Sequence, residues 1–192
     1  MRQIIVSEFI SLDGVVDSPG GDDGLRHAGW TYKDLEPEPA VYELKGREQD
    51  EATALLLGRR SYEIFAPVWP TMPEFAGYGA MPKYVVSTGD PDTTLWSQTT
   101  VLRSLDDVAR LRDDEGGPII VQGSSKLARS LAAAGLVDRY HLLVYPVLLG
   151  DGNRLWANQA QDKTLLRLVE HASYANGVQM QVWDVVRETG QR

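Results

Sequence analysis

Three short segments of the sequence carry groups that could bind a phosphate. They are Gly58-Arg59-Arg60-Ser61, Ser87-Thr88 and Gly123-Ser124-Ser125, and each follows a short run of apolar residues. Serine hydroxyls, arginine guanidiniums and the unpaired backbone N–H groups at the start of a helix all favour phosphate oxygens. If the three segments lie side by side, they predict a binding site for a phosphorylated nucleotide.

Each segment also has an ordinary explanation when it is considered alone. Ser124 or Ser125 could simply cap the helix that follows, and the arginine pair could be solvated. Taken together, an arginine beside Ser87 would suit the 2′-phosphate of an adenosine, which favours NADPH over NADH. Neither the glycine pattern of Rossmann domains nor the lysine-containing P-loop motif is present, so a different kind of nucleotide site is predicted.

The composition of the chain argues against several classes of function and of binding site. The chain has 192 residues, a net charge of -8 and no cysteine. The acidic balance argues against nucleic-acid binding, and the lack of cysteine excludes disulfides, thiolate catalysis and cysteine-ligated metals. His27, His141 and His171 are scattered without ligand spacing, so we expect surface or strand histidines and no metal site. The charged residue in the first apolar run argues against a signal peptide or membrane anchor, and a cytoplasmic location is expected.

The elements that must position these segments can be read from apolar runs and turn signals. Strands are expected at residues 3–10, 54–58, 83–88, 99–102, 119–121, 137–149, 163–173 and 178–187, and helices at residues 40–53, from 61, 104–113 and from about 125 to 134. Pro146 should bend the sixth strand, and Ala175-Asn176-Gly177 is a hairpin signal. Strand–helix alternation followed by antiparallel strands predicts one α/β domain over residues 1–192, with a mixed sheet of about eight strands flanked by helices.

Candidate substrate-binding residues lie near the first strand and in the irregular segments. Asp13, in a Ser-Leu-Asp-Gly turn, could orient a substrate or relay a proton, although an Asp-Gly pair more often simply forms the turn. Residues 16–39 form a long loop that could fold over a ligand. Trp30, Tyr62 and Trp69 could line an aromatic pocket, and each could equally belong to the core.

Several segments of the sequence resemble a known family. Leu56-Leu57-Gly58-Arg59-Arg60-Ser61-Tyr62-Glu63 is similar to the cofactor segment of dihydrofolate reductases. The runs from Val121 to Leu127, from Ala134 to Asp138 and from Tyr145 to Gly152 resemble the reductase domain of the bifunctional riboflavin-biosynthesis deaminase–reductase. The Ser-Leu-Asp-Gly turn is shared as well, so the resemblance covers about residues 3–187.

The resemblance implies a dihydrofolate-reductase-like fold, NADPH binding and hydride transfer to a pyrimidine-like or pterin-like heterocycle. Gly58 to Ser61 would hold the pyrophosphate and, through Arg59, the 2′-phosphate. Ser87 and Thr88 would border the ribose phosphate, and Gly123 to Ser125 would wrap the pyrophosphate. The Gly123–Ser124 peptide corresponds to one that is cis in dihydrofolate reductases.

The resemblance leaves the substrate side open. Dihydrofolate reductases place a carboxylate on the first helix, and here Glu43, Glu48 and Asp50 are all candidates. The zinc-dependent deaminase half is absent, because a chain without cysteine cannot carry its zinc motif. A reductase like that for 5-amino-6-(5-phosphoribosylamino)uracil and a non-catalytic NADP-binding or regulatory protein are both compatible with these residues. The apolar run from Tyr140 to Leu149 further suggests a homodimer surface.

Overall fold

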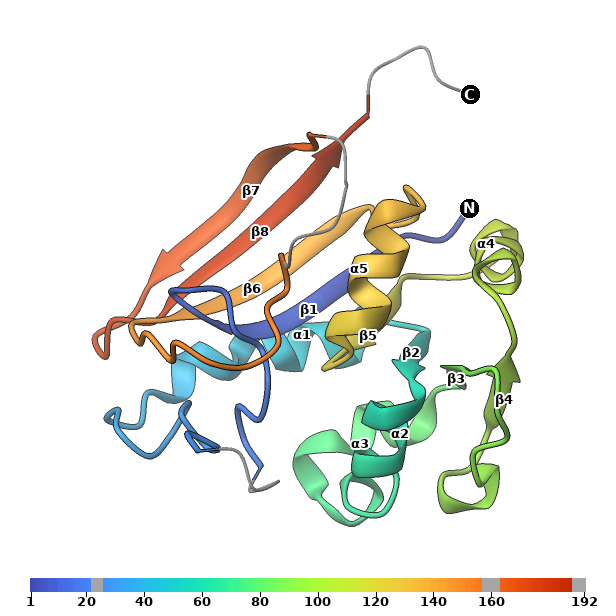
Figure 1. Cartoon of the computed structure of the whole chain (residues 1–192), viewed down its shortest axis with the longest axis horizontal. Helices are drawn as coiled ribbons and strands as arrows, with labels where there is room; N and C mark the ends of the chain where they lie inside the picture. Colours follow the sequence, from blue (N-terminus) through green and yellow to red (C-terminus); the bar gives the residue numbers. More distant parts are fainter. Residues whose placement is uncertain (22–25, 157–162, 188–192) are drawn as a thin grey trace.

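One mixed sheet organises the part of the chain that the structure describes. The computed structural model describes residues 1–21, 26–156 and 163–187 (Figure 1). Within them, eight strands form a sheet in the order β4-β3-β2-β5-β1-β6-β8-β7. The strands are β1 (Ile4–Ser11), β2 (Ala54–Gly58), β3 (Lys83–Val86), β4 (Thr99–Leu102), β5 (Ile119–Gln122), β6 (Arg139–Tyr145), β7 (Leu165–Ser173) and β8 (Gln179–Val186).

The direction of the strands brings the predicted phosphate-binding segments to one edge. The strands from β4 to β6 in this order are parallel to one another, and β8 and β7 continue the sheet antiparallel. Parallel strands end at the same edge of a sheet, and ligands of open α/β sheets bind outside that edge. We call this edge, formed by the carboxyl ends of β3, β2, β5 and β1, the rim.

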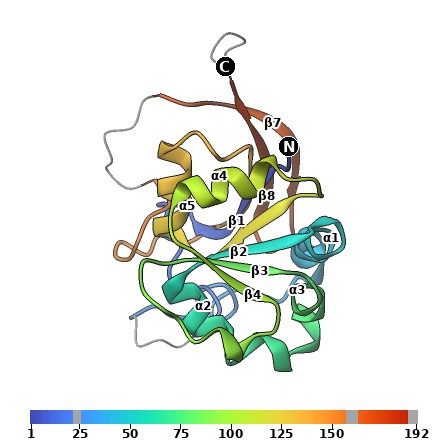
Figure 2. The same cartoon turned by 90° about the vertical axis from the view of Figure 1, so that its right-hand side faces the viewer.

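Helices cover both faces of the sheet. They are α1 (Glu43–Glu51), α2 (Arg59–Phe65), α3 (Ala76–Ala80), α4 (Leu105–Asp113) and α5 (Ser125–Ala133). Figure 2 shows α4 and α5 on the side of the sheet opposite to α1. Leu127 and Leu131 of α5 pack on Val6 and Ile10 of β1, whereas Tyr62 of α2 belongs to the core on the other face. None of the helices in the described residues is long and apolar enough to cross a bilayer.

Most local predictions are confirmed. Ser104 and Asp107 form the two hydrogen bonds of a capping box at the start of α4. Gly135 ends α5 with a φ of +66°, β6 stops just before Pro146, and Gly177 turns the β7–β8 hairpin with a φ of +87°. The sheet with its antiparallel last strands is the predicted fold class.

Several element boundaries differ from the prediction: β6 spans Arg139–Tyr145 rather than 137–149, and α2 begins at Arg59 rather than at residue 61. The segment Pro39–Tyr42 is a 3₁₀ helix, and α1 begins only at Glu43. Strand β3 ends at Val86, because the Ser87 hydroxyl bonds the backbone of Gly89 and closes a bend at Thr88 and Gly89.

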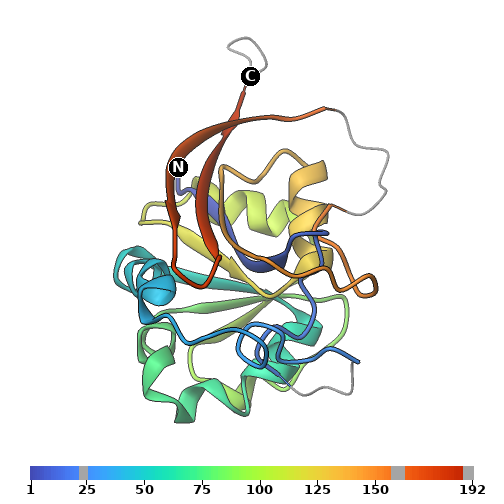
Figure 3. The same cartoon turned by 90° about the vertical axis from the view of Figure 1, so that its left-hand side faces the viewer.

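The first part of the run from Tyr140 to Leu149, which suggested a dimer surface, is buried inside the sheet, whereas Leu148 is exposed. Strand β6 lies inside the sheet between β1 and β8, so Tyr140, Leu142, Leu143 and Tyr145 are buried in the core of the chain itself. The apolar character of this run therefore reflects a strand covered on both faces. The outer strands β8 and β7 form a long, twisted hairpin that rises from the body of the molecule (Figure 3).

Candidate active site

The Gly58 to Ser61 and Gly123 to Ser125 segments meet at the rim through one hydroxyl group. The Ser124 hydroxyl accepts a hydrogen bond from the Gly58 backbone N–H at 2.9 Å and lies 2.9 Å from the Ser61 hydroxyl. Ser61 in turn donates to the Gly123 carbonyl at 2.7 Å. Strands β2 and β5 are neighbours, so their ends fall within reach of short serine side chains. The starts of α2 and α5 are thereby fixed side by side, as the sequence predicted.

Gly123 is the tightest position in this junction. Its φ of +56° lies in the left-handed region, and a Cβ built on it would lie 2.7 Å from the Phe65 ring. Only glycine fits both constraints without strain. The peptide between Gly123 and Ser124 is trans in this structure, so the cis peptide that the resemblance implied is not observed.

The Ser87 segment joins the same rim with two guanidiniums beside it. Arg59 Nη1 would lie 2.6 Å from a Cβ built on Gly89. Arg103, which follows β4, donates to the Gly89 carbonyl at 2.6 Å and also pairs with Asp90. Arg59 itself pairs with Glu63 at 2.7 Å. The turn between Ser87 and Gly89 is therefore flanked by two cations, of which the sequence predicted only Arg59.

The remaining predicted cofactor residues are less engaged. Arg60 and Thr88 are exposed beside the rim, and Ser125 is half-buried as the first residue of α5. Their positions leave them accessible to a ligand at the rim, but they take no part in the hydrogen bonds that join the Gly58 and Gly123 segments.

Asp13 stabilises the turn that follows β1 and joins it to the segment around Gly150. Its carboxylate accepts hydrogen bonds from the Ser11 hydroxyl and from the backbone N–H groups of Leu149 and Gly150, and it pairs with Arg154. Burial acts to raise its pKa, but these hydrogen bonds dominate and lower it to about 2. The geometry favours the turn-forming role over proton transfer, because the group stays ionised at neutral pH.

The three predicted aromatic residues lie in packed surroundings. Tyr62 is fully buried and donates to the Asp92 carbonyl, and Trp30 is buried edge-on against Tyr145. Trp69 stacks between Phe65 and Phe75, at centroid distances of 4.0 and 4.2 Å, and Phe65 in turn lies against Gly123. Trp30 and Tyr62 are thus core residues in this structure, and Trp69 is a half-buried neighbour of the rim.

A buried polar cluster lies under the α1 face of the rim. Its centre is Glu48, the one buried carboxylate among the three candidates on the first helix. Three strands and the preceding turn of α1 supply its partners, which are Ser7 Oγ at 2.5 Å, His141 Nδ1 at 2.8 Å, Gln122 Nε2 at 3.1 Å and Lys45 Nζ at 3.4 Å. We call these five residues the Glu48 cluster.

The charges in the Glu48 cluster keep its carboxylate ionised. Burial by itself would raise the pKa of Glu48. The positive charge of Lys45 and the hydrogen bonds from His141 and Ser7 outweigh this effect, so the pKa is lowered. Lys45 is the most exposed part of this ion pair, with 12% of its side chain accessible. The cluster therefore presents an ammonium group outward and holds a carboxylate behind it.

A second buried carboxyl group lies on the opposite face of β1. Glu8 is 3% exposed, and its Oε1 has no hydrogen-bond partner within the part of the chain that the structure describes. Burial raises the pKa of Glu8 to about 8, partly offset by Lys45 and by the backbone N–H of Ser124. Glu8 is therefore mainly a neutral acid at pH 7, in contrast to Glu48.

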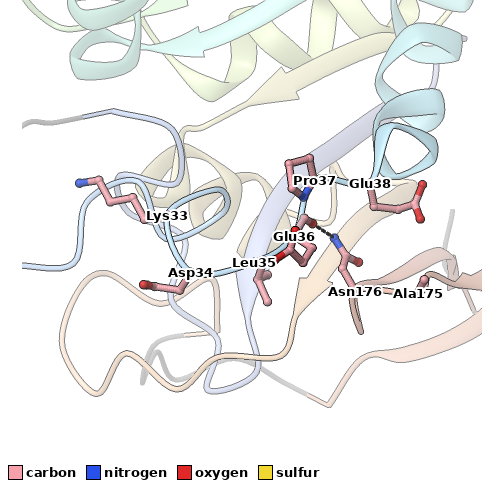
Figure 4. Close-up of a pocket in the computed structure, with 8 residues that line it drawn as sticks. All are labelled: Lys33, Asp34, Leu35, Glu36, Pro37, Glu38, Ala175 and Asn176. Atoms are coloured by element: carbon pink, nitrogen blue, oxygen red, sulfur yellow. Dashed lines mark hydrogen bonds between the residues drawn. The ribbon is translucent and has the colours of Figure 1, made fainter.

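A hollow of about 640 Å³ is lined by none of the predicted cofactor-binding residues. It runs along residues 33–38 and reaches Asn176 of the β7–β8 hairpin, whose amide donates to the Glu36 carbonyl (Figure 4). Asp34, Glu36 and Glu38 line it, so its charge does not suit a phosphate. No cluster of metal-ligating side chains occurs among the described residues. The loop expected to cover the substrate includes residues 22–25, which lie outside them.

Most of the buried polar and charged residues were not predicted from the sequence. Ser7 and Glu8 interrupt an otherwise apolar strand, Ile4-Ile5-Val6-Ser7-Glu8-Phe9-Ile10, and this interruption was the available signal. His141 gave the same signal inside β6. Polar residues in a strand buried on both faces require partners or a function.

Comparisons with known proteins agree with this architecture. The family model described as the RibD C-terminal domain matches residues 2–180. The uncharacterized protein YyaP of Bacillus subtilis (strain 168) is 23% identical over 200 residues, covering 92% of each chain. YwjB of the same organism, also uncharacterized, is 28% identical over 128 residues, covering 66% of this chain and 70% of that protein.

Two solved structures share the fold. One, from Shewanella sp. PV-4 and named for riboflavin biosynthesis, has a TM-score of 0.76 at 15% identity and covers 97% of this chain and 100% of its own. The other, a pyrimidine reductase-like protein from Corynebacterium diphtheriae, has a TM-score of 0.62 at 14% identity and covers 97% and 93%. At these identities the likeness supports the dihydrofolate-reductase-like fold alone.

Proposed function

The chain belongs to the RibD C-terminal domain family, and from this premise we propose that it is an NADPH-dependent reductase. Its substrate would be a small heterocycle of the pyrimidine or pterin kind, as in the reduction of 5-amino-6-(5-phosphoribosylamino)uracil. The family supports a reductase-like function related to riboflavin biosynthesis. The cofactor and the substrate are the parts that we add from the site.

One observation carries the proposal for the cofactor. The Ser124 hydroxyl ties the start of α5 to the start of α2, with Gly123 in a left-handed conformation between them. Two adjacent helix starts and a glycine turn without a side chain leave backbone N–H groups open to a pyrophosphate. The guanidiniums of Arg59 and Arg103 beside Ser87 add the charge that a 2′-phosphate would need.

The residues at the rim would bind and orient the cofactor. When bound, NADPH supplies the hydride, and the protein supplies position and electrostatics. Gly123 to Ser125 would hold the pyrophosphate, and Arg59 would exchange its partner Glu63 for the 2′-phosphate. Arg103 would be a second guanidinium for the same phosphate.

The Glu48 cluster is our candidate for the substrate side. Glu48 fixes the ammonium of Lys45 beside the Ser7 hydroxyl and 4.9 Å above the Phe9 ring. An ammonium, a hydroxyl and an aromatic face are suited to the carbonyl edge and the plane of a heterocycle. We propose that Glu48 acts through Lys45 as a positioning group, because its lowered pKa keeps it ionised rather than ready to donate a proton.

A non-catalytic NADP-binding protein is the second candidate. The observation in its favour is that Glu48 already satisfies its oxygens with partners inside the chain. Mixing the protein with NADPH and a panel of pyrimidines and pterins separates the two functions. Loss of absorbance at 340 nm supports the reductase, whereas saturable NADPH binding without oxidation across the panel supports the binder.

Replacing Arg59 by alanine tests the assignment of the 2′-phosphate. The affinity for NADPH should fall by about tenfold to a hundredfold, because a charge-assisted, bidentate contact is lost. The affinity for NADH should change less than threefold, since NADH lacks that phosphate. Dissociation constants from fluorescence titration of both cofactors measure the effect.

Arg60→Ala is the matched control, because Arg60 precedes Ser61 on the same helix and is exposed. It should leave the preference for NADPH over NADH nearly unchanged. Equal losses for NADPH and NADH in Arg59→Ala, or the same loss of preference in both variants, would refute the role of Arg59.

A further inference from the structure

Glu8 lies directly beneath the turn that begins α5. Side chains alternate along a strand, so Glu8 shares the face of Val6 and Ile10, which pack on α5. Ser7 is the register partner of Gln122 in β5, which places Glu8 next to Gly123. The backbone N–H of Ser124 acts on its carboxyl group. A ligand that binds the Gly123 to Ser125 turn therefore binds next to this carboxyl group.

The surroundings of Glu8 leave it incompletely satisfied. Oε1 has no partner among the described residues, although the side chain is almost fully buried. Lys45 and the Ser124 N–H favour its ionised form, whereas Asp17 and Glu48 oppose it. A buried carboxyl oxygen without a partner is costly in the ionised state and much less costly when the group is neutral.

We propose that Glu8 is a residue of the nucleotide site and that the Gly123 to Ser125 turn binds the cofactor only when Glu8 carries its proton. Two electrostatic effects of an ionised Glu8 would weaken binding at this turn. An ionised Glu8 would place a negative charge beside the incoming pyrophosphate, and it would compete with that pyrophosphate for the Ser124 N–H. The neutral acid does neither, so the bound state holds the proton more tightly than the free protein.

The inference rests on the proposed NADPH site and predicts how binding depends on pH. Since burial raises the pKa of Glu8 to about 8, affinity should be constant from pH 6.5 to 7.5 and fall above pH 8. With full coupling, the dissociation constant for NADPH rises about 30-fold between pH 7 and pH 9.5. The phosphates of NADPH add little to this change, because the second ionisation of a phosphate monoester occurs near pH 6.

The experiment is a calorimetric titration of the intact protein with NADPH from pH 6.5 to pH 9.5. At pH 9, in buffers of different ionisation enthalpy, about one proton should be taken up per NADPH bound. Glu8→Gln mimics the neutral acid, so it should bind with the affinity of the unmodified protein at pH 7. In this variant the rise in the dissociation constant and the proton uptake should both disappear.

Glu43→Gln, which removes an exposed carboxylate from α1, is the matched control and should keep the pH dependence of the unmodified protein. The same rise with pH in Glu8→Gln, or pH-independent binding by the unmodified protein, overturns the role of Glu8 and leaves the NADPH site intact. Failure of the unmodified protein to bind NADPH at pH 7 instead overturns the proposed function, and the role of Glu8 with it.

Discussion

Replacement of Glu48 by alanine should lower the free energy of unfolding by about 3–5 kcal/mol at pH 7. The carboxylate holds Lys45, His141, Ser7 and Gln122 from one buried position. Its removal leaves the mostly buried ammonium of Lys45, whose side chain is 12% exposed, without its counter-charge and leaves several donors unsatisfied, which costs more than the pair itself contributes. Urea denaturation followed by circular dichroism measures the change.

Asp50→Ala on the same helix is the control for this prediction. Asp50 is exposed, so its replacement should change stability by less than about 0.5 kcal/mol. Because the pKa of Glu48 is lowered from its ordinary 4.5 in the folded state, the loss in Glu48→Ala should shrink as the pH falls below 4.5 and through that lowered pKa. A loss below 1 kcal/mol at pH 7 would show that the Glu48 cluster is not a tightly coupled network.

Glu8→Gln, in contrast, should stabilise the protein by about 3 kcal/mol at pH 7. The pKa of Glu8 rises from 4.5 to about 8 on folding, so the unfolded chain releases a proton that the folded chain retains. Between these pH values the release favours the unfolded state, and glutamine removes it. Unfolding free energies of both proteins across pH 4 to 9 measure the difference.

Below pH 4.5 the Glu8 carboxyl group is neutral in both the folded and the unfolded chain, so it costs no stability. As the pH rises from 4.5 through about 8, ionisation of Glu8 in the unfolded chain lowers the free energy of unfolding. The advantage of Glu8→Gln should therefore be near zero at pH 4, grow with pH and level off above pH 8. A constant difference across this range would contradict the raised pKa. A difference of opposite sign at pH 8 would show that Glu8 is stabilised as a carboxylate.

Local chemistry made most of the fold predictable. Ser104 with Asp107, Gly135, Pro146 and Gly177 each mark a boundary through a short-range rule, and the structure follows all four. The meeting of the Gly58 and Gly123 turns required one further assumption, that parallel strands end at one edge. That assumption is a general rule for open α/β sheets, and the Ser124 contacts show that these two turns do meet.

Partners far apart in sequence were not predictable in the same way. Glu48 meets His141 across 93 residues and Gln122 across 74, and no spacing rule connects strands β5 and β6 to α1. Arg103 reaches the Ser87 turn only because β4 lies beside β3. Such contacts depend on the strand order, which the sequence pattern left open.

The apolar composition of β6 also had two explanations, and only the structure distinguishes them. A strand buried within its own sheet and a strand buried against another chain have the same apolar composition. The order β1-β6-β8 decides for the first explanation. The exposed position of Thr88 has a similar origin, because a serine turn ended the strand earlier than its β-branched residues indicated.

The most direct test of the NADPH site is a map of backbone amide chemical shifts on addition of NADPH at pH 7. The largest changes should fall on Gly58 to Ser61, on Ser87 to Gly89 and on Gly123 to Ser125, with little change in the hollow along residues 33–38. Changes centred on that hollow, or no saturable change at any of the three turns, would contradict a dinucleotide site at the rim.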